Sequence, residues 1–91
     1  MLKIYSKTVC PFCVNAKKFL KAKDIPFEEV NIEENEEARE FLKSQGHRSV
    51  PQIYHNGKLF VEGGFQGLSR LTKEDIETKI NRNNDLSLGT L

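Results

Sequence analysis

The chain has 91 residues, the size of one small domain, and its 14 basic and 13 acidic residues give a net charge of +1. This balance excludes the strongly basic composition of a general nucleic-acid-binding domain, so we expect no nucleic-acid partner. No apolar run resembles a signal peptide or reaches the length of a membrane span, which predicts a cytoplasmic protein without membrane contact. In that reducing compartment, we expect the two cysteines to serve chemistry rather than to form a structural bridge.

The first expected elements form a strand–helix–strand unit. Leu2 to Ser6 alternate apolar and polar residues, as a strand does. A helix is expected from Pro11 to about Lys23, because proline suits the first helical position and the Ile25-Pro26 pair resists helical geometry. Phe27 to Ile32 is the second expected strand. The right-handed crossover rule then places the two strands parallel in one sheet.

A second helix and a β-hairpin follow. The helix is expected over Glu34 to Gln45, with acidic residues in its first turn and Gly46 as its stop. Two short strands, Gln52 to His55 and Lys58 to Val61, are joined by Asn56-Gly57, a pair that tolerates the positive φ angles of a tight hairpin. These elements predict an α/β fold with a mixed four-stranded sheet and helices on both faces.

The remaining residues predict a helical end. Gly63-Gly64 ends the fourth strand, and the apolar residues between Phe65 and Leu71 predict a short helix. Thr72 and Asp75 resemble a capping box that opens a last helix to about Asn81. We therefore expect one domain over residues 1–82 and a flexible tail over residues 83–91.

The reactive feature is the Cys10-Pro11-Phe12-Cys13 motif, which lies where the first strand passes to the first helix. With Cys10 at the N-cap, the helix dipole and free N–H groups favour its thiolate, and such a position can lower a cysteine pKa from ~8.5 to roughly 3.5–7.5. Lys7 adds a positive charge nearby. Cys13, one turn later, is expected to lie deeper and to face the same sulfur. The motif predicts a redox pair of one attacking and one resolving sulfur.

The charges are distributed unevenly along the chain. Lysines dominate up to Lys23, whereas Glu28 to Glu40 is acidic with Arg39 alone between the acids. An electropositive end beside Cys10 would attract anionic thiol substrates. Complementation of helix dipoles and solvated helix faces are the alternative explanation of these charges.

The chain resembles the glutaredoxins, of the thioredoxin-fold superfamily, from about Leu2 to Ile80. The resemblance rests on four separated pieces, namely Lys7-Thr8-Val9-Cys10-Pro11-Phe12-Cys13, Arg48-Ser49-Val50-Pro51-Gln52-Ile53, Asn56-Gly57-Lys58 and Gly63-Gly64. Cys-Pro-Phe-Cys is similar to the dithiol Cys-Pro-Tyr-Cys centre of that family. The resemblance implies a glutathione-dependent thiol-disulfide oxidoreductase, active as a monomer, that reduces protein disulfides and glutathione mixed disulfides. Its partners would be glutathione, as reductant, and disulfide-containing proteins, with ribonucleotide reductase as one candidate.

The resemblance also assigns roles to single residues. Cys10 would be the nucleophile and Cys13 the resolving cysteine. Pro51 would follow a cis peptide bond, and the backbone of Val50 would bind the cysteinyl part of glutathione, while Lys7 and Arg48 would contact a glutathione carboxylate. The full set of implied glutathione or substrate contacts comprises Lys7, Phe12, Arg48, Ser49, Val50, Pro51, Gly64, Phe65 and Gln66.

One position departs from the family pattern. Glutaredoxins usually carry an aspartate where this chain has Gly67, and that aspartate holds the γ-glutamyl end of glutathione. Without it a charge-assisted contact of roughly 1.5–3 kcal/mol is missing, although Gln66 and helix amides can still bind the γ-glutamyl carboxylate. An alternative is therefore a glutaredoxin-like redoxin that is reduced by thioredoxin reductase and donates electrons to ribonucleotide reductase.

A third hypothesis belongs to a different class, an iron–sulfur cluster carrier or metal-binding module. The two cysteines with His47 and His55 could supply four ligands. The histidines lack zinc-finger spacing, and each is expected at the surface. We therefore expect no metal cofactor.

Overall fold

The computed structural model describes the backbone of residues 1–88 and the side chains of residues 1–81. Its elements are, in chain order, β1 (Leu2–Ser6), α1 (Pro11–Ala22), β2 (Phe27–Asn31), α2 (Glu36–Ser44), β3 (Gln52–His55), β4 (Lys58–Val61), α3 (Gly64–Leu68) and α4 (Lys73–Leu88). The four strands form one sheet in the order β2-β1-β3-β4. β1 pairs in parallel with β2 and antiparallel with β3, which pairs antiparallel with β4, so the predicted mixed sheet is confirmed.

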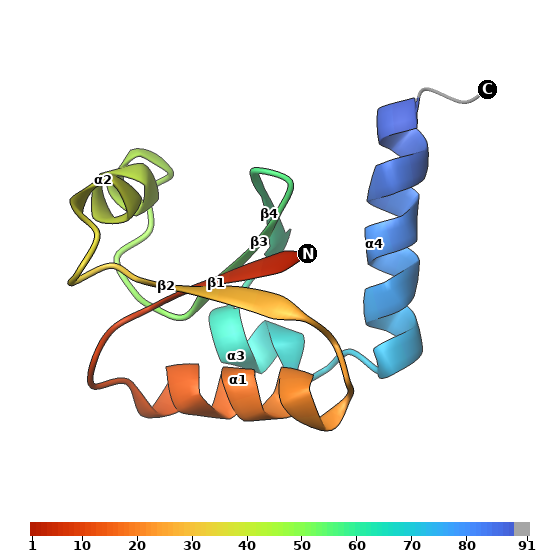
Figure 1. Ribbon diagram of the computed structural model, residues 1–91, viewed down its shortest axis with the longest axis horizontal. Helices are drawn as coiled ribbons and strands as arrows, with labels where there is room; N and C mark the ends of the chain where they lie inside the picture. The colour runs from red at the N-terminus through yellow and green to blue at the C-terminus, as the bar shows by residue number, and fades with distance from the viewer. Residues whose placement is uncertain (89–91) are drawn as a thin grey trace.

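Helices cover both faces of this sheet, with α2 on one face and α1 and α3 on the other (Figure 1). Because neighbouring residues of a strand point to opposite faces, β1 contributes to two separate cores. Ile4 belongs to the cluster that also contains Ala16 and Leu20 of α1. Tyr5 belongs to the cluster that contains Leu42 of α2. The strand that leads to the cysteines is therefore fixed from both sides.

The second helix begins later than the sequence suggested. Its N-cap is Asn35, whose side-chain oxygen accepts a hydrogen bond of 3.0 Å from the N–H of Ala38, and the first helical residue is Glu36. Asparagine is among the preferred N-cap residues because its side chain satisfies an N–H group that has no partner within the helix. The predicted start at Glu34 missed this cap.

The β-hairpin and the last cap agree with their predictions. Asn56 and Gly57 have φ angles of 53° and 79°, as a tight hairpin turn requires. The Thr72 N–H donates to the Asp75 carboxylate, and the Asp75 N–H donates to the Thr72 hydroxyl, each at 3.0 Å. This capping box opens α4.

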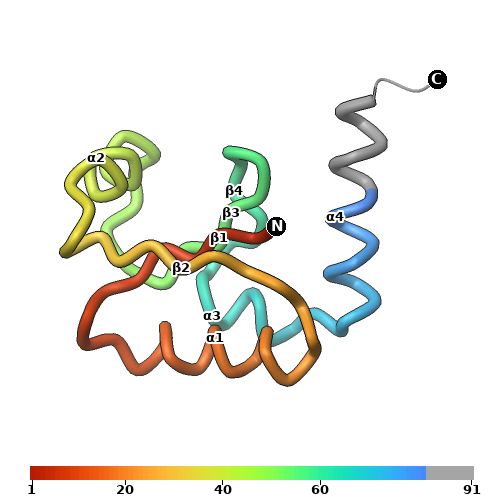
Figure 2. Tube along the Cα trace, in the orientation of Figure 1, coloured from red at the N-terminus to blue at the C-terminus, as the bar shows by residue number. Residues whose placement is uncertain are grey.

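Two features of this half of the chain differ from their expectations. α4 runs to Leu88, so its expected end near Asn81 was too early. The division of the chain at residue 82 stays a prediction. The structure does not describe the side chains of residues 82–91, which form the grey end of the trace in Figure 2, or the backbone of residues 89–91. His55, expected at the surface, is 3% exposed because β3 is covered on both faces, and burial lowers the pKa of its imidazole. Within residues 1–88, no helix is long and apolar enough to cross a membrane.

Candidate active site

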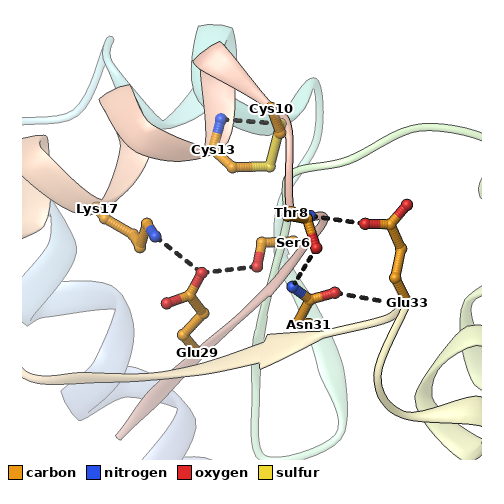
Figure 3. Close-up of polar contacts among 8 residues, drawn as sticks. All are labelled: Ser6, Thr8, Cys10, Cys13, Lys17, Glu29, Asn31 and Glu33. Atoms are coloured by element: carbon orange, nitrogen blue, oxygen red, sulfur yellow. Dashed lines mark hydrogen bonds and ion pairs between the residues drawn. A yellow bond between two sulfur atoms is a disulfide. The ribbon is translucent and has the colours of Figure 1, made fainter.

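The two cysteines lie at the start of α1 and differ in exposure. Cys10 is the N-cap in extended geometry, is half-buried, and forms a disulfide with Cys13, which is 1% exposed (Figure 3). The N–H of Cys13 donates a hydrogen bond of 3.1 Å to Sγ of Cys10. A donor at this position favours the charged form of the outer sulfur after reduction. The geometry therefore separates a reachable sulfur from a buried one.

A second segment, far away in the sequence, meets the first cysteine. The Val50–Pro51 peptide bond is cis, as expected, and the carbonyl oxygen of Val50 lies 3.8 Å from Sγ of Cys10. This is a packing contact, because a disulfide sulfur carries no proton to donate. Gly64, at the start of α3, packs closely against this loop. A Cβ atom at this position would lie only 2.6 Å from the carbonyl oxygen of Pro51.

A cavity of about 630 Å³ opens beside this loop, and we call it the proline cavity. It is lined by Phe12, Gln45, Gly46, His47, Ser49, Val50, Pro51, Gln52, Leu59, Glu62, Gly63, Gly64, Phe65 and Gln66. Phe12 is 56% exposed, and its ring lies 6.5 Å from that of Phe65. The sequence did not determine whether Phe12 is a platform for substrate or a cap on the helix. The structure places its ring on the wall of the cavity.

A second cavity of about 260 Å³ also borders Val50, and we call it the cationic cavity. Four basic side chains belong to its lining, and His47, Ser49 and Val50 are shared with the proline cavity. The full lining consists of Lys7, Ile32, Arg39, Leu42, Lys43, His47, Arg48, Ser49 and Val50. Lys7 and Arg48 were expected at the site, whereas Arg39 and Lys43 of α2 were missed. The available signal was Arg39, which stands alone in the acidic stretch and four residues before Lys43, on the same face of the helix.

All the residues expected to contact glutathione line at least one of these two cavities. Lys7 and Arg48 line the cationic cavity, and Ser49 and Val50 line both. The others line the proline cavity, namely Phe12, Pro51, Gly64, Phe65 and Gln66. Sγ of Cys10 lies 3.8 Å from the carbonyl oxygen of Val50, a residue that lines both cavities.

A polar network that the sequence did not suggest connects α1 to the sheet below the cysteines. Ser6 is fully buried and its hydroxyl donates to Oε2 of Glu29, which also accepts from Nζ of Lys17, both at 2.8 Å (Figure 3). Lys17 follows Cys13 by one helical turn. The hydrogen bond and charge of Lys17, and then the Ser6 hydroxyl, hold the pKa of Glu29 below its usual value near 4.5.

A second network holds the loop that leads to Cys10. Oε1 of Glu33 accepts a hydrogen bond of 2.9 Å from the Thr8 N–H, and the Thr8 hydroxyl accepts one of 3.1 Å from the amide of Asn31 (Figure 3). Oδ1 of Asn31 in turn accepts from the Glu33 N–H at 2.9 Å. The hydrogen bonds from Thr8 lower the pKa of Glu33. The loop is therefore attached to the end of β2.

The metal-site hypothesis finds no support in the arrangement of ligands. Among the described residues, no three His, Cys, Asp or Glu side chains converge as a metal site requires. Nε2 of His47 instead lies 2.7 Å from the hydroxyl of Tyr54, and His55 is buried in β3.

The fold and the reactive pair define a thiol-disulfide oxidoreductase of the thioredoxin-like class. The glutaredoxin family model matches residues 2–60. A glutaredoxin-like 8.6 kDa protein of Clostridium pasteurianum is 40% identical over 62 residues, covering 67% of this chain and 83% of that protein. Glutaredoxin 1 of Rickettsia conorii is 35% identical over 83 residues, covering 88% of this chain and 79% of its own.

Solved structures agree with this assignment. A wheat glutaredoxin has a TM-score of 0.70 at 26% identity, covering 89% of this chain and 79% of its own. The glutaredoxin-like NrdH-redoxin of Escherichia coli has a TM-score of 0.66 at 27% identity, covering 78% of this chain and 93% of its own. The chain belongs to the glutaredoxin family, and Cys10 and Cys13 are its redox-active pair.

Proposed function

We propose that this glutaredoxin takes its electrons from glutathione and reduces protein disulfides and glutathione mixed disulfides. The observation that carries the proposal is the contact of Cys10 with Val50, which lines both a cavity with four basic side chains and a cavity formed around Pro51. Glutathione is an extended thiol with carboxylates at both ends. A thiol of this shape can place its sulfur against Cys10 beside Val50 and one carboxylate in the cationic cavity.

The reaction proceeds through a mixed disulfide. The Cys10 thiolate attacks one sulfur of the substrate disulfide, and the other substrate sulfur leaves as a thiolate. Cys13 then attacks Sγ of Cys10, its proton passes to the second departing sulfur, and the Cys10–Cys13 disulfide forms. Two glutathione molecules restore the two thiols and leave as glutathione disulfide. Two electrons thus pass from glutathione to the substrate.

The cationic cavity supports the choice of an anionic thiol as reductant. Both cysteines of the chain lie in the reactive pair, as expected of a protein in the reducing cytoplasm. The test is NADPH consumption with a disulfide substrate, coupled either to glutathione and glutathione reductase or to thioredoxin reductase alone. We expect turnover in the glutathione system. Turnover only in the thioredoxin reductase system, and none in the glutathione system, would contradict the proposal.

A specific observation favours one second candidate, reduction by thioredoxin reductase with ribonucleotide reductase as electron acceptor. Gly67 occupies the position where the family's aspartate would bind the γ-glutamyl end of glutathione. The similarity to NrdH-redoxin, whose activity profile is described as thioredoxin-like, points in the same direction. The two coupled assays decide between these donors, and ribonucleotide reductase serves as the acceptor in a further assay.

A further inference from the structure

The two cavities that share Val50 have linings of opposite charge. The cationic cavity is lined by Lys7, Arg39, Lys43 and Arg48 and by no acidic residue. The proline cavity has no Lys or Arg in its lining, and Glu62 is the one acidic residue there. Glu62 is exposed, and among the described residues no hydrogen bond or ion pair occupies its carboxylate. A free carboxylate in the wall of a cavity is available to a cationic group of a ligand.

The backbone explains why the acidic residue is absent from position 67. A Cβ atom on Gly67 would collide with the carbonyl oxygen of Glu62 and would lie 2.9 Å from Cγ2 of Val61. The turn from β4 into α3 therefore places the backbone of Glu62 where a side chain at position 67 would begin. An aspartate at position 67 would require this turn to move, whereas Glu62 can supply a carboxylate from the turn itself.

We propose that the Glu62 carboxylate binds the ammonium group of the γ-glutamyl end of glutathione, in place of an aspartate at position 67. This inference rests on the proposed use of glutathione and names the residue that selects it. The cysteinyl sulfur of glutathione meets Cys10 at Val50, the glycyl carboxylate lies in the cationic cavity, and the ammonium lies in the proline cavity near Glu62. Glu62 is a specificity-determining residue, because an otherwise identical thiol without the amino group loses this contact.

The step to be measured is a single exchange reaction. The Cys10 thiolate forms a bond to the glutathionyl sulfur of a mixed disulfide, and the bond to the other sulfur breaks and releases a peptide thiolate. The substrates are one peptide thiol bound either to glutathione or to glutaryl-cysteinyl-glycine, which is glutathione without its amino group. Reduced protein in excess reacts with each substrate in a single turnover, and release of the peptide gives the second-order rate constant.

We expect the wild-type protein to react about tenfold faster with the glutathione substrate than with the deaminated one, because a charge-assisted contact stabilises only the former. In Glu62→Gln this preference should fall to about one, since the ammonium loses its charged partner. The matched control is Glu77→Gln, which removes one exposed carboxylate of α4 outside both cavities and should keep the wild-type preference.

Three outcomes would overturn the inference. A wild-type protein that reacts equally with both substrates has no contact with the ammonium, although its use of glutathione would stand. A Glu62→Gln protein that keeps the tenfold preference assigns the contact to another residue. Failure of the wild-type protein to react with either mixed disulfide, while it accepts electrons from thioredoxin reductase, would reject the proposed function and the inference with it.

Discussion

Cys10 and Cys13 carry the same functional group in different surroundings, and this difference supports the proposed roles of attacking and resolving cysteine. Cys10 is half-buried at the N-cap and accepts the Cys13 N–H, whereas Cys13 is 1% exposed beneath it. A protein disulfide can therefore reach the first sulfur and not the second. The buried sulfur is limited to intramolecular attack, for which it is already in place.

These roles predict separate effects of two serine substitutions. Cys13→Ser should leave reduction of small glutathione mixed disulfides nearly unchanged, because glutathione itself can release the product from Cys10. The same variant should reduce a protein disulfide at least about tenfold more slowly, since the resolving attack is lost. Both rates are measured by NADPH consumption in the glutathione system. Cys10→Ser should abolish both activities, and any rate above background in that variant would contradict the assigned roles.

At the scale of elements, the site depends on the fit of α3 against the loop that contains Pro51. Gly64 has a φ angle of 57° and no room for a side chain, because the carbonyl oxygen of Pro51 lies 2.6 Å from the position of a Cβ atom. Gly57 in the hairpin also has a positive φ angle, of 79°, but open space within 4 Å of its Cβ position. The two glycines share a backbone conformation and differ in their surroundings.

Alanine substitutions at these two glycines should therefore lower the free energy of unfolding by different amounts. Each variant should lose about 1–2 kcal/mol of unfolding free energy, because alanine is disfavoured in the left-handed conformation. Gly64→Ala should lose a further ~1–3 kcal/mol of unfolding free energy, because the backbone of α3 or of the Pro51 loop must shift. Urea denaturation of both variants measures this difference. Equal losses would show that α3 does not need its close approach to Pro51.

At the scale of the whole molecule, the ionised side chain of Glu29 links helix α1 to the sheet. Glu29 on the edge strand β2 accepts hydrogen bonds from Lys17 of α1 and from buried Ser6 of β1. Global unfolding releases both contacts. The lowered pKa of Glu29 therefore connects the stability of the entire fold to pH.

The sign of this dependence follows from the direction of the shift. A carboxyl group whose pKa is lower in the folded state stabilises the fold above its unfolded pKa, and this stabilisation is lost as pH falls through the folded value. Since the Glu29 side chain is 38% exposed, solvent screening limits the gain to less than about 1 kcal/mol. Wild type should therefore exceed Glu29→Gln in unfolding free energy at neutral pH, and the difference should shrink from about pH 5 downward.

The matched control is Glu28→Gln, on the same strand. Glu28 is exposed and forms no ion pair among the described residues, so its substitution should not produce this pH-dependent difference. Urea denaturation between neutral and acidic pH gives all three curves. A stability gap between wild type and Glu29→Gln that stays constant across this range would contradict the role assigned to Glu29.

The sequence by itself determined what short stretches of chain encode. The alternation in Leu2 to Ser6, Pro11 after Cys10, and Asn56-Gly57 each specify local geometry, and these elements agree with the structure. The motifs around Cys10 and Val50 also led to the family. The cap at Asn35 was missed because the neighbouring acids were equally compatible with a helix start.

Tertiary structure decided which distant residues share a surface. Arg39 and Lys43 of α2 join Lys7 in one cavity, and the backbone of Glu62 explains the glycine at position 67. The burial of His55 and the link from Glu29 to α1 likewise depend on how the layers pack. Such proximity is set by the crossing of helices over the sheet, which leaves no periodic signal in the chain. The sequence thus identified the reactive sulfurs, and the packing of distant segments decided the charges that surround them.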